Sequence, residues 1–73
     1  MKEMFESLIQ EREDLRRKIA SLEFYCMVSP RYRHLEIYHQ KLICEQLSTM
    51  RIYLSIIEAR IEHIGMIGGA DNG

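Results

Sequence analysis

The chain has 73 residues, of which 47% are hydrophobic and 29% are charged, and its formal net charge is −1. This length suits one small domain, and the composition excludes a disordered chain. The charge argues against a general nucleic-acid-binding protein, since such proteins need an excess of lysine and arginine. The sequence has neither an apolar run of about 18 residues nor the apolar core of a signal peptide, so we expect a cytoplasmic protein that does not enter the membrane.

The first predicted element is a helix over about residues 2–27. Apolar side chains recur there at alternating steps of three and four residues, the heptad pattern of a helix that packs along one stripe. The members of this stripe are Met1, Phe5, Leu8, Leu15, Ile19, Leu22 and Cys26, with Arg12 as one polar member.

A corner over about residues 28–34 interrupts this pattern. Pro30 disfavours helical backbone at Ser29, so we expect Ser29 to cap a new helical turn in which Pro30 takes the first position. The corner combines basic and aromatic side chains, which can bind phosphate groups and stack on bases. The candidate ligand-binding residues in and beside it are Arg31, Tyr32, Arg33, His34 and His39.

The second predicted helix covers about residues 35–64. It carries one continuous heptad stripe, and Gly65 is expected to end it. Residues 65–73 are then a flexible tail, and residues 1–64 form a single domain. The stripe consists of Ile43, Leu47, Met50, Leu54, Ile57, Ile61 and Ile64.

Two long helices joined by a short corner predict an all-α fold, an antiparallel two-helix hairpin that resembles a coiled coil. Folding the chain at the corner pairs the two stripes and places Ile19 near Ile43. Cys26 and Cys44 then lie several turns apart, so we expect free thiols.

Apolar residues of the second helix extend beyond its stripe, so its apolar face is too wide for one partner helix to cover. A single hairpin of this size also buries little apolar area against the entropy lost on ordering the chain. We therefore expect a homo-oligomer, in the simplest case a two-fold dimer that forms a four-helix bundle, or a larger bundle. The candidate interface residues are Leu42, Ile52, Ile56, Ile61 and Ile64.

A polar ribbon repeats every seven residues along the second helix, at Gln46, Tyr53 and Arg60, with His39 one step earlier. These side chains offer an amide, an aromatic face and a guanidinium group. The ribbon has two interpretations that stay open: a ligand-binding surface, or a hydrogen-bonded flank that fixes the register of the bundle.

No catalytic or metal-binding motif accompanies these features. His34 and His39 are five residues apart, which does not place them on one helical face, and no acid cluster or cysteine pair joins them. Neither a Ser-His-Asp nor a Cys-His arrangement can be assembled with specificity. We therefore expect a non-enzymatic binding protein without a metal or cofactor.

The spacing on the second helix matches a known pattern. In this sequence it reads Gln46-x3-Met50-x2-Tyr53-x3-Ile57-x2-Arg60-Ile61. Together with the charged helix EREDLRRKIASLEFY and the short connector, it makes residues 11–64 resemble a family of small two-helix proteins encoded by tailed bacteriophages and prophages. That resemblance implies a phage accessory protein in the host cytoplasm and no particular mechanism.

Small phage accessory proteins commonly modulate or evade host functions, so a counter-defence role is the leading hypothesis. In it, the oligomer sequesters a small anionic, nucleotide-like ligand. Arg60 would hold phosphate with Arg31 or Arg33, while Tyr53 or Tyr32 stacks on the base. One alternative is an inhibitor that blocks a host protein. Another is an RNA-binding hairpin dimer like the plasmid regulator Rop, which the net charge disfavours.

Overall fold

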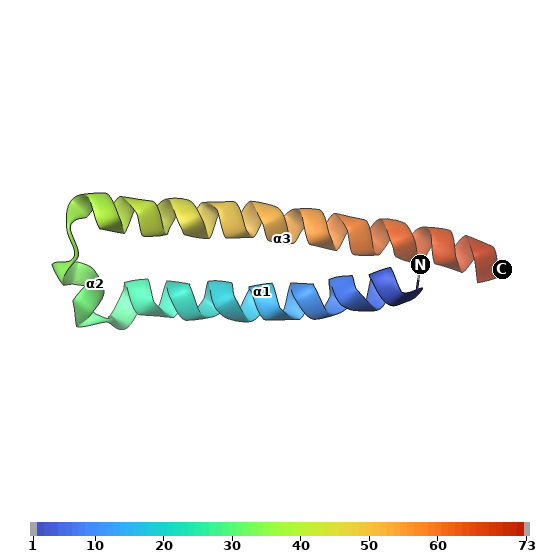
Figure 1. Ribbon diagram of the computed structural model, residues 1–73, viewed down its shortest axis with the longest axis horizontal. Coiled ribbons are helices and arrows are strands. Elements are labelled where there is room, and N and C mark those ends of the chain that lie inside the picture. Colours follow the sequence, from blue (N-terminus) through green and yellow to red (C-terminus); the bar gives the residue numbers. More distant parts are fainter. Residues whose placement is uncertain (1, 73) are drawn as a thin grey trace.

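The computed structural model describes the backbone of residues 2–72 and the side chains of residues 2–67. The helices are α1 (Lys2–Val28), α2 (Pro30–His34) and α3 (Ile37–Asn72). The described residues contain no strand, so the predicted all-α class is confirmed. α1 and α3 lie side by side and run in opposite directions, with α2 at the end where they connect (Figure 1). The molecule is a rod of 56 × 16 × 15 Å.

α2 begins as the sequence predicts. Ser29 has extended backbone, with φ −78° and ψ 125°, and its hydroxyl accepts a hydrogen bond from the Arg31 N–H at 3.2 Å. Pro30 follows at the start of the helix. Because the first N–H groups of a helix lack partners within it, this cap removes one unpaired donor, and the lack of an N–H on proline costs nothing there.

α2 is a separate helix and not the first turn of α3. Its C-cap residue, Leu35, is extended, with φ −70° and ψ 150°. The Tyr32 carbonyl accepts a hydrogen bond from the Leu35 N–H at 3.2 Å and another from the Gln40 side chain at 2.8 Å. The Gln40 side chain of α3 thus pairs with a carbonyl group at the end of α2. The chain can therefore turn between the two helices without the glycine that commonly ends a helix.

α3 continues to Asn72, beyond the end predicted near Ile64. Gly65 does not have the positive φ of a helix-terminating glycine. A glycine inside a helix costs about 1 kcal/mol relative to alanine, which is too little to end a long helix by itself. The predicted helix end was therefore wrong, and the flexibility of residues 65–73 stays a prediction.

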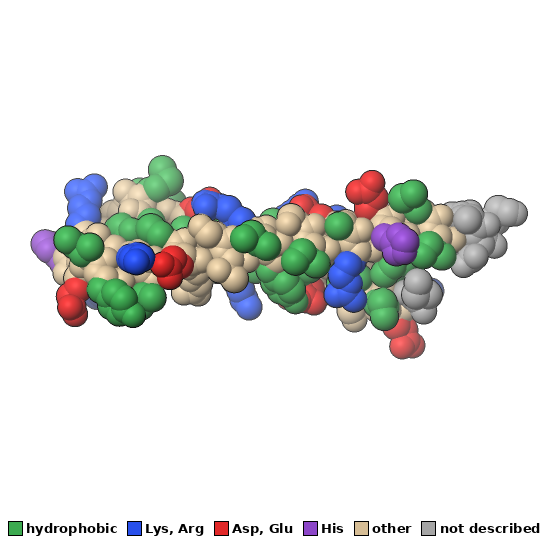
Figure 2. Space-filling model, turned by 90° about the horizontal axis from the view of Figure 1, so that it is seen from above, with side chains coloured by type: hydrophobic (Ala, Val, Ile, Leu, Met, Phe, Trp, Pro, Cys, Tyr) green, Lys and Arg blue, Asp and Glu red, His purple; other side chains and the backbone are tan. Residues whose placement is uncertain are grey.

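The core is a single layer of side chains between α1 and α3. All its buried members lie on the two predicted stripes, and Ile57 has no exposed surface. The outward side of α3 keeps hydrophobic side chains along its length, between charged ones (Figure 2). The buried residues are Leu8, Leu15, Ile19, Leu47, Ile57 and Ile64.

Two predicted interface residues belong to this core. Ile64 is buried and Ile61 packs against the buried cluster. The prediction that Ile64 lies in an oligomer interface is corrected, because its surface is used within one chain. Ile61 is only half-buried, and its place in an interface stays a prediction. Leu42, Ile52 and Ile56 are exposed, as an interface between chains requires.

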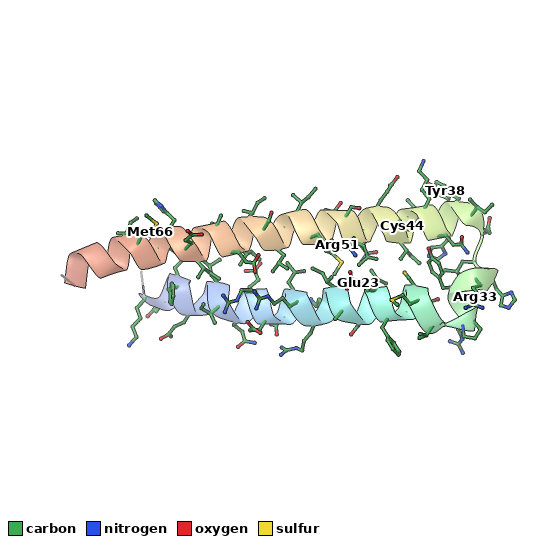
Figure 3. The ribbon with its side chains drawn as sticks, turned by 180° about the vertical axis from the view of Figure 1, so that it is seen from behind. Glu23, Arg33, Tyr38, Cys44, Arg51 and Met66 are labelled. Atoms are coloured by element: carbon green, nitrogen blue, oxygen red, sulfur yellow. The ribbon has the colours of Figure 1, made fainter. Side chains whose placement is uncertain are left out.

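Two ion pairs show how α1 and α3 are aligned. Nη2 of Arg16 lies 2.7 Å from Oε2 of Glu58. Glu23 and Arg51 form a second pair with the charges exchanged between the helices, and they face each other across the helix pair in Figure 3. In an antiparallel coiled coil such pairs flank the apolar seam and report its register.

This alignment differs from the predicted one by about one heptad. Pairing Ile19 with Ile43 would place Arg16 opposite Gln46 and Glu11 opposite Arg51, whereas Arg16 pairs with Glu58 and Glu11 with Tyr53. The partner is displaced by twelve residues on one flank and by two on the other, so the mean displacement is seven residues, about 10.5 Å along the helix. The reason is α2, which extends the layer of α1 so that the first turns of α3 lie over α2 (Figure 1). A slip of seven residues keeps every stripe residue facing the partner helix, so the heptad pattern alone cannot distinguish the two alignments.

Candidate functional site

The polar ribbon of α3 forms one edge of the helix pair, beside α1. The Tyr53 hydroxyl donates a hydrogen bond to the Glu11 carboxylate on α1. This bond, together with partial desolvation, raises the pKa of Tyr53 above its ordinary value, and the nearby charge of Arg60 opposes the shift. At this position the ribbon ties the two helices together, which agrees with the interpretation that it fixes register.

Gln46 lies in a groove on the same edge, nearer to the corner. The groove has a volume of about 560 Å³, within the range of small-molecule sites. Most of its lining comes from α1, whose residues were not among the sequence-based candidates. Its walls are Asp14, Arg17, Lys18, Ser21, Leu22, Tyr25, Gln46 and Met50.

The lining of the groove has more basic than acidic side chains. Arg17 forms an ion pair with Asp14, one helical turn before it. Among the described residues, Lys18 forms no ion pair. The Lys18 ammonium is therefore a cation that a ligand can reach without displacing a carboxylate. A periodic signal could have found it, because Lys18 and Tyr25 are spaced by seven residues, as the ribbon is.

Arg60 lies at the other end of the ribbon, in a second, more apolar hollow of about 470 Å³. Met4, Ile56, Ile64 and His63 line this hollow with it. Gln46 and Arg60 belong to different hollows of one edge, and Tyr53, bonded to Glu11, lies between them in the ribbon.

Tyr32 lies at the corner, where its side chain is half-buried and contacts residues of both long helices. Its hydroxyl shares a hydrogen bond with the Cys44 thiol at 3.5 Å, and its ring meets the Tyr25 ring edge-on with centroids 6.0 Å apart. The bond to Cys44, burial and the nearby Cys26 thiol raise the pKa of Tyr32 to about 12. Both thiols are free, as predicted, although they lie near one hydroxyl and not several turns apart.

The remaining corner candidates lie at one end of the rod, and of these only His39 shares the ribbon's heptad position on α3. Arg31, Arg33 and His34 lie exposed on α2, and His39 is exposed in the first turn of α3. Arg60 lies about 35 Å along α3 from its first residue. Within one chain, Arg60 and Arg31 or Arg33 are therefore too far apart to bind one phosphate. Their meeting between chains of an oligomer stays a prediction.

A family model described as Sequestin matches residues 2–63 of this chain. The chain belongs to the Sequestin family. No curated protein and no solved structure matches it. The family match spans α1, α2 and most of α3, and so includes the groove around Gln46 and the whole polar ribbon.

The chain also exposes apolar side chains away from the groove. Phe24, Met27 and Val28 are exposed in the last turns of α1, beside the basic corner. On α3, Leu42, Ile52 and Ile56 are exposed as well, which makes two separate apolar surfaces.

Other kinds of site find no support in the part of the chain that the structure describes. These residues contain no group of three or more His, Cys, Asp or Glu side chains able to hold a metal ion. None of their helices is both long and apolar enough to cross a bilayer.

Proposed function

We propose that this chain is a non-enzymatic binding protein that sequesters a small anionic, nucleotide-like ligand within a homo-oligomer. The observation that carries the proposal is the groove between α1 and α3, where a free cation, an amide and an aromatic ring line one cavity. The family name is consistent with a sequestering role.

The anionic part of the ligand would bind Lys18. A lysine ammonium is a compact charge with three donors and is a common phosphate ligand. Arg17 stands next to it and can redistribute its hydrogen bonds between Asp14 and a phosphate oxygen. Because Asp14 is the one acidic side chain of the groove, the lining carries more positive than negative charge.

The ring of a nucleotide would lie against Tyr25, Leu22 and Met50. A base stacked on an aromatic ring gains about 1–3 kcal/mol in nucleic-acid complexes, whatever its identity. Gln46 adds an amide that both donates and accepts, so it can read the edge of the base. The groove thus separates a charged subsite from an apolar one, as a nucleotide requires.

Assembly would complete the enclosure of the ligand. Ligand sites that bind tightly bury about 70–90% of a small molecule, whereas a groove on the side of a two-helix rod leaves one face of the ligand in water. A second chain packed over this edge would cover that face. Such a protein would act by stoichiometric capture and needs no catalytic group.

The resemblance to small phage proteins gives this activity a biological setting. In a host cell whose defence depends on a nucleotide signal, a phage protein that holds the signal lowers its free concentration. The proposed role is therefore counter-defence in the host cytoplasm.

A thermal-shift experiment tests the proposal. The wild-type chain is melted with a panel of mono-, di- and cyclic nucleotides, each at millimolar concentration. A member present at a hundred times its Kd should stabilise the fold by about 2.7 kcal/mol, which raises Tm by about 10 °C or more for a domain of this size. If no member of the panel shifts Tm, the proposal is wrong.

Variants then locate the site. Lys18→Gln and Gln46→Ala should each remove most of the shift without changing the Tm of the free protein. Lys41→Gln is the matched control, since Lys41 is an exposed lysine outside the groove. An equal loss in Lys41→Gln would show non-specific charge attraction instead of a site.

A second candidate function rests on the apolar surface at the end of α1. Phe24, Met27 and Val28 are exposed beside the basic corner, and an apolar patch with a polar rim is typical of a protein-binding surface. In this candidate the chain blocks a host protein. Phe24→Ser would then abolish the protection of phage in infected cells and leave nucleotide binding unchanged.

A further inference from the structure

The outward side of α3 carries a second heptad seam, which faces away from α1. We call it the outer seam. It runs from Leu42 to Met66 at alternating steps of three and four residues. Ile52 and Ile56 at its centre are 62% and 51% exposed, and both ends of the seam are apolar as well. A regular seam of this kind on a free surface is typical of a helix that packs against another helix.

The outer seam is complementary to itself when it is read in the opposite direction. In an antiparallel pair of identical helices centred between Ile52 and Ile56, each of these residues meets the other on the second copy. The same alignment places Leu42 against Met66. Apolar side chains therefore meet apolar side chains at the centre and at both ends of the seam.

The polar positions of the outer seam agree with this alignment. Glu45 meets His63 of the second copy, and the small side chains of Thr49 and Ala59 meet each other. A parallel pairing would instead set Glu45 against Glu45 and His63 against His63. The antiparallel arrangement thus avoids the contact between two Glu45 carboxylates. The symmetric order of apolar, small and polar positions favours a second copy over an unrelated helix, which has no reason to match this order.

We infer that α3 packs against α3 of a second copy along the outer seam, antiparallel, about a two-fold axis between Ile52 and Ile56. Such an interface is isologous, so each contact occurs twice. The dimer removes the central isoleucines from water and carries two equivalent ligand grooves, one from each chain. Because the outer seam faces away from α1, this contact does not cover the groove edge. It is a further assembly contact beside the one in the proposed function, and it does not depend on which ligand is bound.

Cross-linking between single cysteines tests this alignment. In a chain with Cys26→Ser and Cys44→Ser, Thr49→Cys and Ala59→Cys are made separately and mixed in equal amounts. Oxidation with copper-phenanthroline should give a disulfide between the two different chains. Each chain carries a single cysteine, so any disulfide joins two chains. Its geometry requires the two Cα atoms to lie within about 7 Å of each other, as the proposed alignment places them.

The controls separate the outcomes. Thr49→Cys alone should cross-link poorly, because in the antiparallel pair position 49 of one chain lies far from position 49 of the other. Efficient cross-linking of either variant alone would indicate a parallel pair and overturn the inference. Ser55→Cys, an exposed position off the outer seam, should not cross-link with Ala59→Cys. Helicity by circular dichroism verifies that each variant folds.

Charge exchange gives an independent measurement. His63→Glu should weaken the dimer at least several-fold in analytical ultracentrifugation because it sets two carboxylates against each other, and Glu45→Lys in the same chain should recover most of the loss. If the wild-type chain sediments as a monomer at high micromolar concentration, the inference is wrong. A monomer that still shows the nucleotide-dependent thermal shift would leave the proposed ligand binding intact.

Discussion

Arg16 of α1 and Glu58 of α3 form an ion pair, with Nη2 2.7 Å from Oε2. The pair lies on the flank of the core opposite to the polar ribbon, and with Glu23 and Arg51 it sets the alignment of the two helices. Because the charges are exchanged between the two pairs, a slip of one heptad would break both.

The first prediction concerns this ion pair. Glu58→Arg should lower the free energy of unfolding because it places two arginines side by side, and Arg16→Glu in the same chain should recover the loss. The coupling in a double-mutant cycle should be about 0.2–1 kcal/mol, since both side chains are partly exposed. Urea unfolding measures it. Zero coupling would contradict the alignment described here.

Ile57 and Ile52 provide a matched comparison of core and surface. Ile57 has no exposed surface, so Ile57→Ala should cost about 2–5 kcal/mol of unfolding free energy. Ile52→Ala removes the same atoms from a side chain that is 62% exposed in one chain. It should leave the helicity of the dilute protein unchanged and weaken self-association. Circular dichroism and sedimentation measure the two effects, and equal loss of helicity in both variants would contradict the distinction.

Alkaline pH should weaken the fold through Tyr53. The hydrogen bond to Glu11 raises the pKa of Tyr53, so the native chain keeps this proton at a pH where the unfolded chain has lost it. The contribution is complete below the ordinary tyrosine pKa of about 10, and the free energy of unfolding falls as pH rises above it. Tyr53→Phe and Glu11→Gln should each flatten this fall in urea unfolding measured across that range. An unchanged slope in both would contradict the assignment.

Gly65→Ala should stabilise the protein. Gly65 lies inside α3 without a positive φ, and an added Cβ would meet no atom within 4 Å. Alanine in a helix is favoured over glycine by about 0.5–1 kcal/mol. A rise in Tm checks this, whereas a fall would indicate that the helix ends at Gly65, as the sequence suggested.

Much of the fold follows from local patterns in the sequence. The two stripes predict every buried residue, because a heptad repeat fixes which side chains share one face of a helix. Ser29 and Pro30 predict the start of α2, because capping depends on neighbouring residues alone.

The candidate site was predicted only in part, because a groove depends on both of its walls. Gln46 was a candidate from its repeat along α3. The opposite wall, with Lys18 and Tyr25, became visible only when the alignment of α1 was known.

The sequence by itself therefore determined the all-α class, the inner faces of both helices and the first turn of the corner. The tertiary structure decided the register, the break at Leu35 and the neighbours of each ribbon residue. The sequence could not decide the register, because a heptad repeat presents the same apolar stripe to the partner helix after a slip of seven residues. Contacts between distant residues, such as Gln40 with the Tyr32 carbonyl and Arg16 with Glu58, select one alignment, and no local pattern contains them.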